Sequence, residues 1–142
     1  MPPKEVFISH SSRDATTTAS LTETLRNHGV PAWHSPTTLI GAQEWQDEIG
    51  RALRRCDWFL VLLSENSINS IWVKRELGYA LRHSQYEGKI LPVTLEPCDY
   101  DELSWTLGDF QIVDMHGDYQ QGCTNILRAW GIGLDETRLV RP

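Results

Sequence analysis

The sequence lacks the short motifs that identify the commonest nucleotide, metal and hydrolase sites. No G-x-G-x-x-G follows its first apolar run and no G-x-x-x-x-G-K-[ST] loop occurs, so we expect neither an ordinary Rossmann dinucleotide site nor a P-loop. The five histidines form no H-E-x-x-H cluster, so no metal site is expected. No G-x-S-x-G elbow is present to carry a serine nucleophile. Any chemistry must therefore come from a site of another kind.

Cysteine, positive charge and long apolar runs are also scarce. The three cysteines, Cys56, Cys98 and Cys123, contain no C-x-x-C pair, so we expect reduced thiols in a cytoplasmic protein. A net charge of -6 argues against general nucleic-acid binding, which needs a basic surface. The longest apolar run, 58–63, is too short to span a bilayer, and no signal peptide is recognisable. We therefore expect neither nucleic acid nor membrane as a partner.

What the sequence does contain is an alternation of short apolar runs with amphipathic segments. The apolar runs predict strands at 5–9, 30–34, 57–63, 89–95 and 110–113. The amphipathic segments predict helices at 13–28, 44–56, 71–83 and 122–130. This order predicts an α/β domain over 1–133, with a parallel sheet covered by helices on both faces. Residues 134–142 are expected to be a flexible tail or the start of a linker.

Three details of this prediction concern single segments. Residues 64–69 are polar and predict a turn between the third strand and the following helix. Pro92 lies inside the fourth strand, which predicts an edge position or a distorted ladder, because proline cannot donate to a neighbouring strand. Residues 96–109 show no regular pattern and are predicted to be irregular.

Polar segments follow the first three predicted strands, at 9–13, 34–43 and 64–70. In open parallel α/β sheets, ligands bind beyond the carboxyl ends of the strands. These three loops are therefore the expected place for a ligand, although periodicity alone does not name one.

The helix at 71–83 carries the most suggestive pair of side chains. Trp72 and Glu76 are four residues apart and therefore share a helix face, beside the apolar stripe of Val73, Leu77 and Ala80. A carboxylate at the rim of the core, next to an aromatic ring, can accept ribose hydroxyls or stabilise a developing cation. The alternative is a surface glutamate that pairs with a neighbouring cation on the same helix.

Six motifs occur in an order that is far more specific than any one of them. They are E-V-F-I-S-H at 5–10, V-P-A-W at 30–33, L-I-G-A at 39–42 followed by Trp45, the run 52–64, S-I-W-V-K-R-E-L at 70–77, and I-L-P-V at 90–93. Together they resemble the Toll/interleukin-1 receptor (TIR) domains of bacterial type, over residues 4–131. The resemblance implies a flavodoxin-like five-stranded parallel sheet.

The resemblance also implies a choice between two functions. TIR domains include adaptors that work by self-association and enzymes that cleave NAD+ between nicotinamide and ribose. In the enzymes, the glutamate of the W-x-x-x-E helix is catalytic, and here that position is Glu76. NAD+ is then the substrate, with no cofactor or metal, and self-association with other TIR domains in bacterial defence or signalling is implied. The substrate contacts expected by resemblance are Ser9, His10, Ser11, Trp33, Leu39, Trp45 and Trp72.

Several interpretations stay open at this point. Trp33 could simply pack in the core, and His10 and Ser11 could cap the first helix. Some enzyme members carry charged residues in the loops where this chain has serine, threonine and isoleucine, so its polar substrate contacts are expected to differ or to come from another subunit. A protein-interaction module without catalysis is the alternative function, suggested by the loop 39–42 and by the basic cluster Arg51, Arg54 and Arg55. That cluster is otherwise a solvated helix face.

Overall fold

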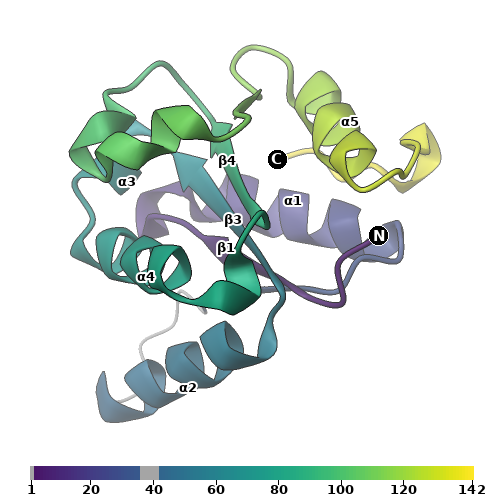
Figure 1. Ribbon diagram of the computed structural model, residues 1–142. Helices are drawn as coiled ribbons and strands as arrows, with labels where there is room; N and C mark the ends of the chain where they lie inside the picture. The colour runs from purple at the N-terminus through teal and green to yellow at the C-terminus, as the bar shows by residue number, and fades with distance from the viewer. Residues whose placement is uncertain (1, 36–41) are drawn as a thin grey trace.

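A computed structural model describes residues 2–35 and 42–142 of the chain, with the side chains of 42–44 left aside. Its described residues form one sheet of five parallel strands, in the order β2-β1-β3-β4-β5 (Figure 1). The strands are β1 (Val6–Ser9), β2 (Ala32–His34), β3 (Trp58–Leu63), β4 (Ile90–Thr94) and β5 (Val113–Asp114). This strand order is that of flavodoxin-like folds, so the predicted fold class is confirmed.

Helices cover both faces of the sheet. One face carries α1 (Ala15–Asn27) and α5 (Tyr119–Ala129), and the other carries α2 (Ala42–Arg55) and α4 (Ile71–Arg82) (Figure 1). A short helix, α3 (Glu65–Ile68), follows β3. Single 3-10 turns occur at Ser12–Asp14, Ser84–Tyr86, Tyr100–Glu102, Trp105–Asp109 and Glu136–Arg138. The turns at Tyr100–Glu102 and Trp105–Asp109 lie in the segment 96–109, which shows no regular pattern in sequence.

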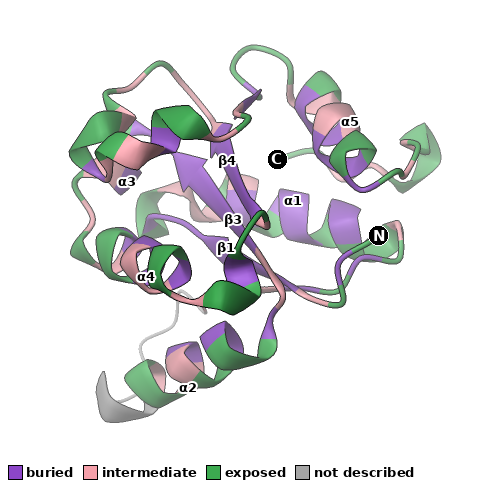
Figure 2. Cartoon of the chain, in the orientation of Figure 1, coloured by how far each residue is buried: buried purple, intermediate pink, exposed green. Residues whose placement is uncertain are grey.

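The central strand β3 divides the core into two halves. Leu60 and Leu62 pack toward α1 and α5, whereas Phe59, Val61 and Leu63 pack toward α2 and α4. Successive residues of a strand point to opposite faces, and here both faces are covered, so the strand is apolar without alternation. Figure 2 shows the strands as the buried centre between the helices.

Two features of the middle strands differ from the prediction. The polar segment after β3 is a helical turn rather than a simple turn, because Ser64 and Ser67 form a reciprocal capping box around α3. The strand containing Pro92 is not at the edge of the sheet, since β4 pairs with both β3 and β5. The pairing with β5 begins only at Val93, so no partner on that side needs the N–H that Pro92 lacks.

The C-terminal third also differs in its boundaries. Of the predicted strand 110–113 only Val113 belongs to β5, because the N–H of Phe110 closes the preceding 3-10 turn on Leu107. Helix α5 begins three residues earlier than predicted, where the side chain of Asp118 accepts a hydrogen bond from the N–H of Gln121 (3.0 Å). The predicted bounds followed the spacing of apolar residues, and that spacing does not report a polar capping residue such as Asp118.

The segment 134–142, expected to be a flexible tail or a linker, lies against α1 in the structure. The N–H of Asp135 donates to Nε2 of His28 (3.0 Å), and the N–H of Val140 donates to Oγ1 of Thr24 (2.9 Å). Leu134 and Leu139 pack on the apolar cluster between α1, α5 and the sheet. These contacts join residues more than 100 positions apart, which no local pattern reports.

A close approach between α5 and the end of β5 gives a test of this packing. A Cβ placed on Gly122 would lie 2.6 Å from Cγ and 2.8 Å from Cβ of buried Met115, whereas the nearest atom to a Cβ on Gly50 is the mobile end of Arg54 at 3.4 Å. We expect Gly122→Ala to lower the free energy of unfolding by about 1–3 kcal/mol through overpacking. Gly50→Ala should raise it by up to about 1 kcal/mol, as usual inside a helix. Urea unfolding of both variants checks this, and equal effects would contradict it.

Candidate functional site

A small pocket lies where the carboxyl ends of β1 and β2 meet α2 and the start of α4. It has a volume of about 110 Å³ and is lined by His10, Ser11, Ser12, Ser35, Trp45, Ile49, Ser70, Trp72 and Glu76. This is the end of the sheet at which parallel α/β folds bind ligands. Ligand pockets commonly measure about 300–1,000 Å³, so this one accommodates a ring-sized part of a ligand and not a whole dinucleotide.

Glu76 reaches the pocket because of the phase of α4. The helix begins at Ser70, whose Oγ accepts a hydrogen bond from the N–H of Val73 (3.3 Å). From that start, Glu76 falls on the buried side, together with Val73 and Leu77, and is 5% exposed. Its Oε1 accepts a hydrogen bond from Oγ of Ser9 at the end of β1 (2.6 Å). Glu76 is therefore a buried carboxyl group at the pocket and not a surface glutamate.

Burial sets the protonation of Glu76. It raises the pKa of the carboxyl group to about 7, because the charged form loses its hydration, and the hydrogen bond from Ser9 partly opposes this by favouring the carboxylate. Near neutral pH the group is therefore present in both forms. A strongly shifted titratable group in a pocket is typical of functional sites.

Burial shifts the pKa of His10 in the opposite direction to that of Glu76. Burial, and then the neighbouring His34, lower its pKa to about 4, so its ring is neutral at neutral pH. The two histidine rings meet edge to face with centroids 5.5 Å apart. Among the described residues, Nδ1 of His10 has no hydrogen-bond partner, and neither does Nε1 of Trp45, another lining residue of the pocket.

Two tryptophans form an aromatic wall. The rings of Trp45 on α2 and Trp72 on α4 are nearly parallel, at 7°, with centroids 6.1 Å apart. The guanidinium of Arg75 lies 5.3 Å from the centre of the Trp72 ring, in a cation–π arrangement. The wall is thus bordered by the positive charge of Arg75.

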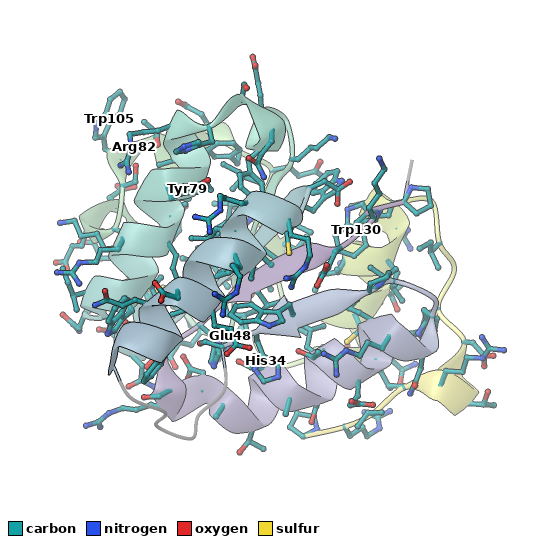
Figure 3. All side chains as sticks on the ribbon, turned by 90° about the horizontal axis from the view of Figure 1, so that it is seen from below. His34, Glu48, Tyr79, Arg82, Trp105 and Trp130 are labelled. Carbon is teal, nitrogen blue, oxygen red and sulfur yellow. The ribbon has the colours of Figure 1, made fainter. Side chains whose placement is uncertain are left out.

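A second, more open hollow of about 320 Å³ is also lined by Glu76 and lies between α2 and α4. It shares Ile49, Trp72 and Glu76 with the smaller pocket, and its remaining lining includes Tyr79 and two arginines, Arg75 and Arg82. Figure 3 shows Tyr79 and Arg82 along α4. The carboxyl group therefore contributes to both a small pocket of mixed polarity and a larger hollow with cations.

The structure brings together most of the site residues expected from sequence. His10, Ser11, Trp45, Trp72 and Glu76 line the pocket. Ser9 does not line it but binds Glu76 directly. Trp33 is not at the pocket: it pairs with Phe7 in the register of β1 and β2, and the two rings pack 5.1 Å apart. Leu39 lies outside the described residues.

Four lining residues were not named individually by the sequence analysis: Ser12, Ser35 and Ser70 lie in the three loops expected to hold a ligand, and Ile49 lies on α2. Ser35 directly follows β2 and Ser70 caps α4, so their positions at strand and helix ends were the available signals. Ser11 caps the 3-10 turn before α1, because its Oγ accepts a hydrogen bond from the N–H of Arg13 (3.2 Å), and it also lines the pocket.

Among the described side chains, those of residues 2–35 and 45–142, no cluster of three or more histidine, cysteine and acidic groups is arranged to hold a metal ion. In the same part of the chain, no helix has both the length and the apolar character needed to cross a bilayer.

The family model of the TIR domain matches residues 6–127, which is most of the sequence. The chain belongs to the TIR domain family. One curated relative is the NAD(+) hydrolase TcpC of Escherichia coli O6:H1 (strain CFT073), which is 30% identical over 92 residues. The match covers 63% of this TIR domain but only 30% of TcpC, so this chain spans a minor part of that relative's length.

Solved TIR domains confirm the fold. Those of the activated Roq1 resistosome, which recognises the pathogen effector XopQ, superpose with a TM-score of 0.70 at 18% identity, covering 89% of this chain and 98% of that one. The TIR domain of the Toll-related receptor TRR-2 from Hydra magnipapillata gives a TM-score of 0.64 at 17% identity, covering 87% and 88%.

The buried carboxyl group makes the stability of this TIR domain depend on pH. The pKa of Glu76 in the folded state, about 7, lies above its ordinary value of 4.5, so between these pH values the folded protein keeps a proton that the unfolded chain has lost. The contribution of Glu76 is thus fully present below pH 4.5 and lost as pH rises through 7. Relative to Glu76→Gln, we expect the wild type to lose up to about 3 kcal/mol over this window.

Urea unfolding of both proteins from pH 5 to 8 checks this difference. The opposite trend from His10, whose folded pKa is lowered, is common to both proteins and cancels in the comparison. Parallel stability profiles for wild type and variant would show that Glu76 is not held in the protonated form by the fold.

Proposed function

We propose that this TIR domain cleaves NAD+ at the bond between nicotinamide and ribose, with Glu76 as the catalytic carboxylate. The observation that carries the proposal is a nine-tenths-buried carboxyl group that lines a pocket at the carboxyl end of the sheet, beside Trp72 of the W-x-x-x-E motif. The similarity to a protein named an NAD(+) hydrolase supports the same reaction.

The reaction suits a site with one carboxylate and no metal. When the bond from the ribose to the pyridinium nitrogen breaks, its electron pair goes to the ring, and nicotinamide leaves as a neutral molecule without a general acid. Positive charge develops on the ribose, and a water molecule then adds to it and releases a proton. A carboxylate held close to that charge, in surroundings of low polarity, stabilises the transition state more than it could in water.

The two hollows that meet at Glu76 suit the nicotinamide ring and the pyrophosphate of a dinucleotide. The smaller pocket, with its aromatic wall, suits the nicotinamide ring. The larger hollow offers the guanidinium groups of Arg75 and Arg82, which suit the pyrophosphate. A dinucleotide that spans both hollows carries its ribose past the carboxylate.

The direct test is nicotinamide release from NAD+, measured by chromatography over a concentration series of the protein. Glu76→Gln preserves the size of the buried side chain but removes its charge, so we expect release to fall at least 100-fold, on the order of the loss of one electrostatic contact in other enzymes. Glu87→Gln, which changes an exposed glutamate beyond the end of α4, is the matched control and should release nicotinamide like the wild type.

Undiminished release from Glu76→Gln would remove Glu76 from the reaction. Absence of release at every concentration would favour the alternative, a TIR–TIR interaction module. The features that suggested a module give it limited support: residues 39–41 lie outside the described part of the chain, and Arg55 of the basic cluster is paired with Glu5 (2.7 Å), while Arg51 and Arg54 are exposed.

The pH dependence of kcat/KM tests the protonation state. This ratio reports the pKa of groups in the free enzyme, and Glu76 must be ionised to stabilise a cation. We therefore expect kcat/KM to rise from pH 6 to 8 with a midpoint near the pKa of about 7. In Ser9→Ala the midpoint should move to higher pH, because the hydrogen bond that favours the carboxylate is lost. A flat profile, or a midpoint that moves down in Ser9→Ala, would contradict this assignment.

A further inference from the structure

We infer that the small pocket recognises the carboxamide group of its ligand through Trp45 and His10. The indole N–H of Trp45 donates a hydrogen bond to the carbonyl oxygen, and the ring of His10 accepts one from the amide NH2. The inference rests on the proposed function for the identity of the ligand, and it adds what holds the nicotinamide ring and why an amide is preferred.

The argument begins with polar atoms that the fold leaves unpaired. Among the described residues, the buried side-chain nitrogens without a hydrogen-bond partner are Nδ1 of His10, Nε1 of Trp45 and Nε1 of Trp130. Leaving such a group unpaired costs about 1–3 kcal/mol, so buried polar atoms are nearly always satisfied. Two of these three atoms belong to residues that line one pocket of about 110 Å³. Their concentration there indicates a ligand with polar atoms of its own.

The third atom shows what an unpaired indole looks like without a ligand site. Trp130 is 3% exposed, lies in the apolar cluster with α1 and α5, and packs edge to face against Trp58 with centroids 5.7 Å apart. It lines none of the pockets described above. Trp130 is therefore an internal reference for an indole N–H buried by packing alone.

The chemistry of the two pocket residues specifies the kind of ligand. An indole N–H can only donate, and a neutral imidazole offers one acceptor nitrogen. His10 is in the neutral form near neutral pH, because burial opposes its charge. A primary carboxamide presents a carbonyl acceptor and an NH2 donor on the same carbon, so it can satisfy both residues at once. An apolar substituent of the same size satisfies neither.

The placement of this pair also orients the ligand. Trp45 stacks beside Trp72, and Glu76 lines the same small pocket. A pyridinium ring whose carboxamide is held by Trp45 and His10 can direct its nitrogen, which carries the ribose and lies two ring positions from the carboxamide-bearing carbon, toward Glu76. Trp45 and His10 thus act as positioning residues for the proposed cleavage.

The first experiment observes the indole N–H directly. In a two-dimensional ¹H–¹⁵N spectrum of the whole chain, the six tryptophans give six indole signals, and Trp45→Phe identifies that of Trp45. We expect nicotinamide to shift the Trp45 signal in a saturable way and to leave that of Trp130 unmoved. The ligand 3-methylpyridine, which replaces the carboxamide by a methyl group, should shift the Trp45 signal far less. An unmoved Trp45 signal at saturating nicotinamide, or no binding of nicotinamide, would overturn the inference.

The second experiment compares affinities in variants. Trp45→Phe keeps an aromatic ring but loses the donor, and His10→Phe loses the acceptor. Each should weaken nicotinamide binding about 2- to 10-fold, as expected for one neutral hydrogen bond, while 3-methylpyridine binding stays the same. Trp105→Phe is the matched control, since Trp105 is 81% exposed at the outer margin of the molecule (Figure 3) and should change neither affinity.

The outcomes separate this inference from the proposed function. Equal losses for both ligands in Trp45→Phe and His10→Phe would mean that these residues only shape the pocket, which overturns carboxamide recognition. Nicotinamide binding with a shifted Trp45 signal but without cleavage of NAD+ would remove the proposed function and retain the recognition. Glu76-dependent cleavage with an unmoved Trp45 signal would retain the proposed function and overturn carboxamide recognition by Trp45.

Discussion

The hydrogen bond between Ser9 and Glu76 is the contact on which the rest of the site depends. It joins the carboxyl end of β1 to the middle of α4, two segments 67 residues apart, at a distance of 2.6 Å inside the protein. Burying an ionisable group is costly, and one hydroxyl donor compensates only part of that cost. The remaining cost appears as the raised pKa of Glu76. The fold therefore keeps the carboxyl group away from the solvent that would otherwise stabilise its charge. In such surroundings the charge acts most strongly on a bound cation.

The sheet supplies the rigidity that this contact needs. Strand β1 pairs on both sides, with β2 and β3, so the position of Ser9 is set by ladders of hydrogen bonds. Helix α4 is fixed by its cap at Ser70 and by the packing of Val73 and Leu77 against the half of the core that contains Phe59 and Val61. A site built on a central strand and a packed helix is held more precisely than one built on loops. The pocket residues contributed by α2 complete it from a third direction.

How much of this was predictable follows from how local each signal is. The run at 57–63 predicted β3, and the spacing of Trp72 and Glu76 placed them on one face of α4, because both patterns are contained in a single element. The partner of Glu76 was not predictable in the same way, since the role of Ser9 depends on the packing of α4 across β1. Trp33 was placed at the site by resemblance, but it lies inside β2 opposite Phe7 rather than beyond the end of the strand. Pro92 was expected at an edge or in a distorted ladder, but its strand β4 pairs with both β3 and β5, and the pairing with β5 begins only at Val93.

One cause acts on both titratable residues of the pocket and gives it a definite electrostatic character. Burial raises the pKa of Glu76 and lowers that of His10, so both side chains are driven toward their neutral forms. A pocket of this kind does not attract a cation as strongly as a permanently charged carboxylate does. A cationic pyridinium ring that enters it would itself favour ionisation of Glu76, because an opposite charge nearby stabilises the carboxylate. In the proposed reaction nicotinamide leaves as a neutral molecule, and that stabilisation would pass to the ribose on which the positive charge develops. The charge on Glu76 is then greatest when a substrate is bound, and the empty site is spared the full cost of a buried, unpaired carboxylate.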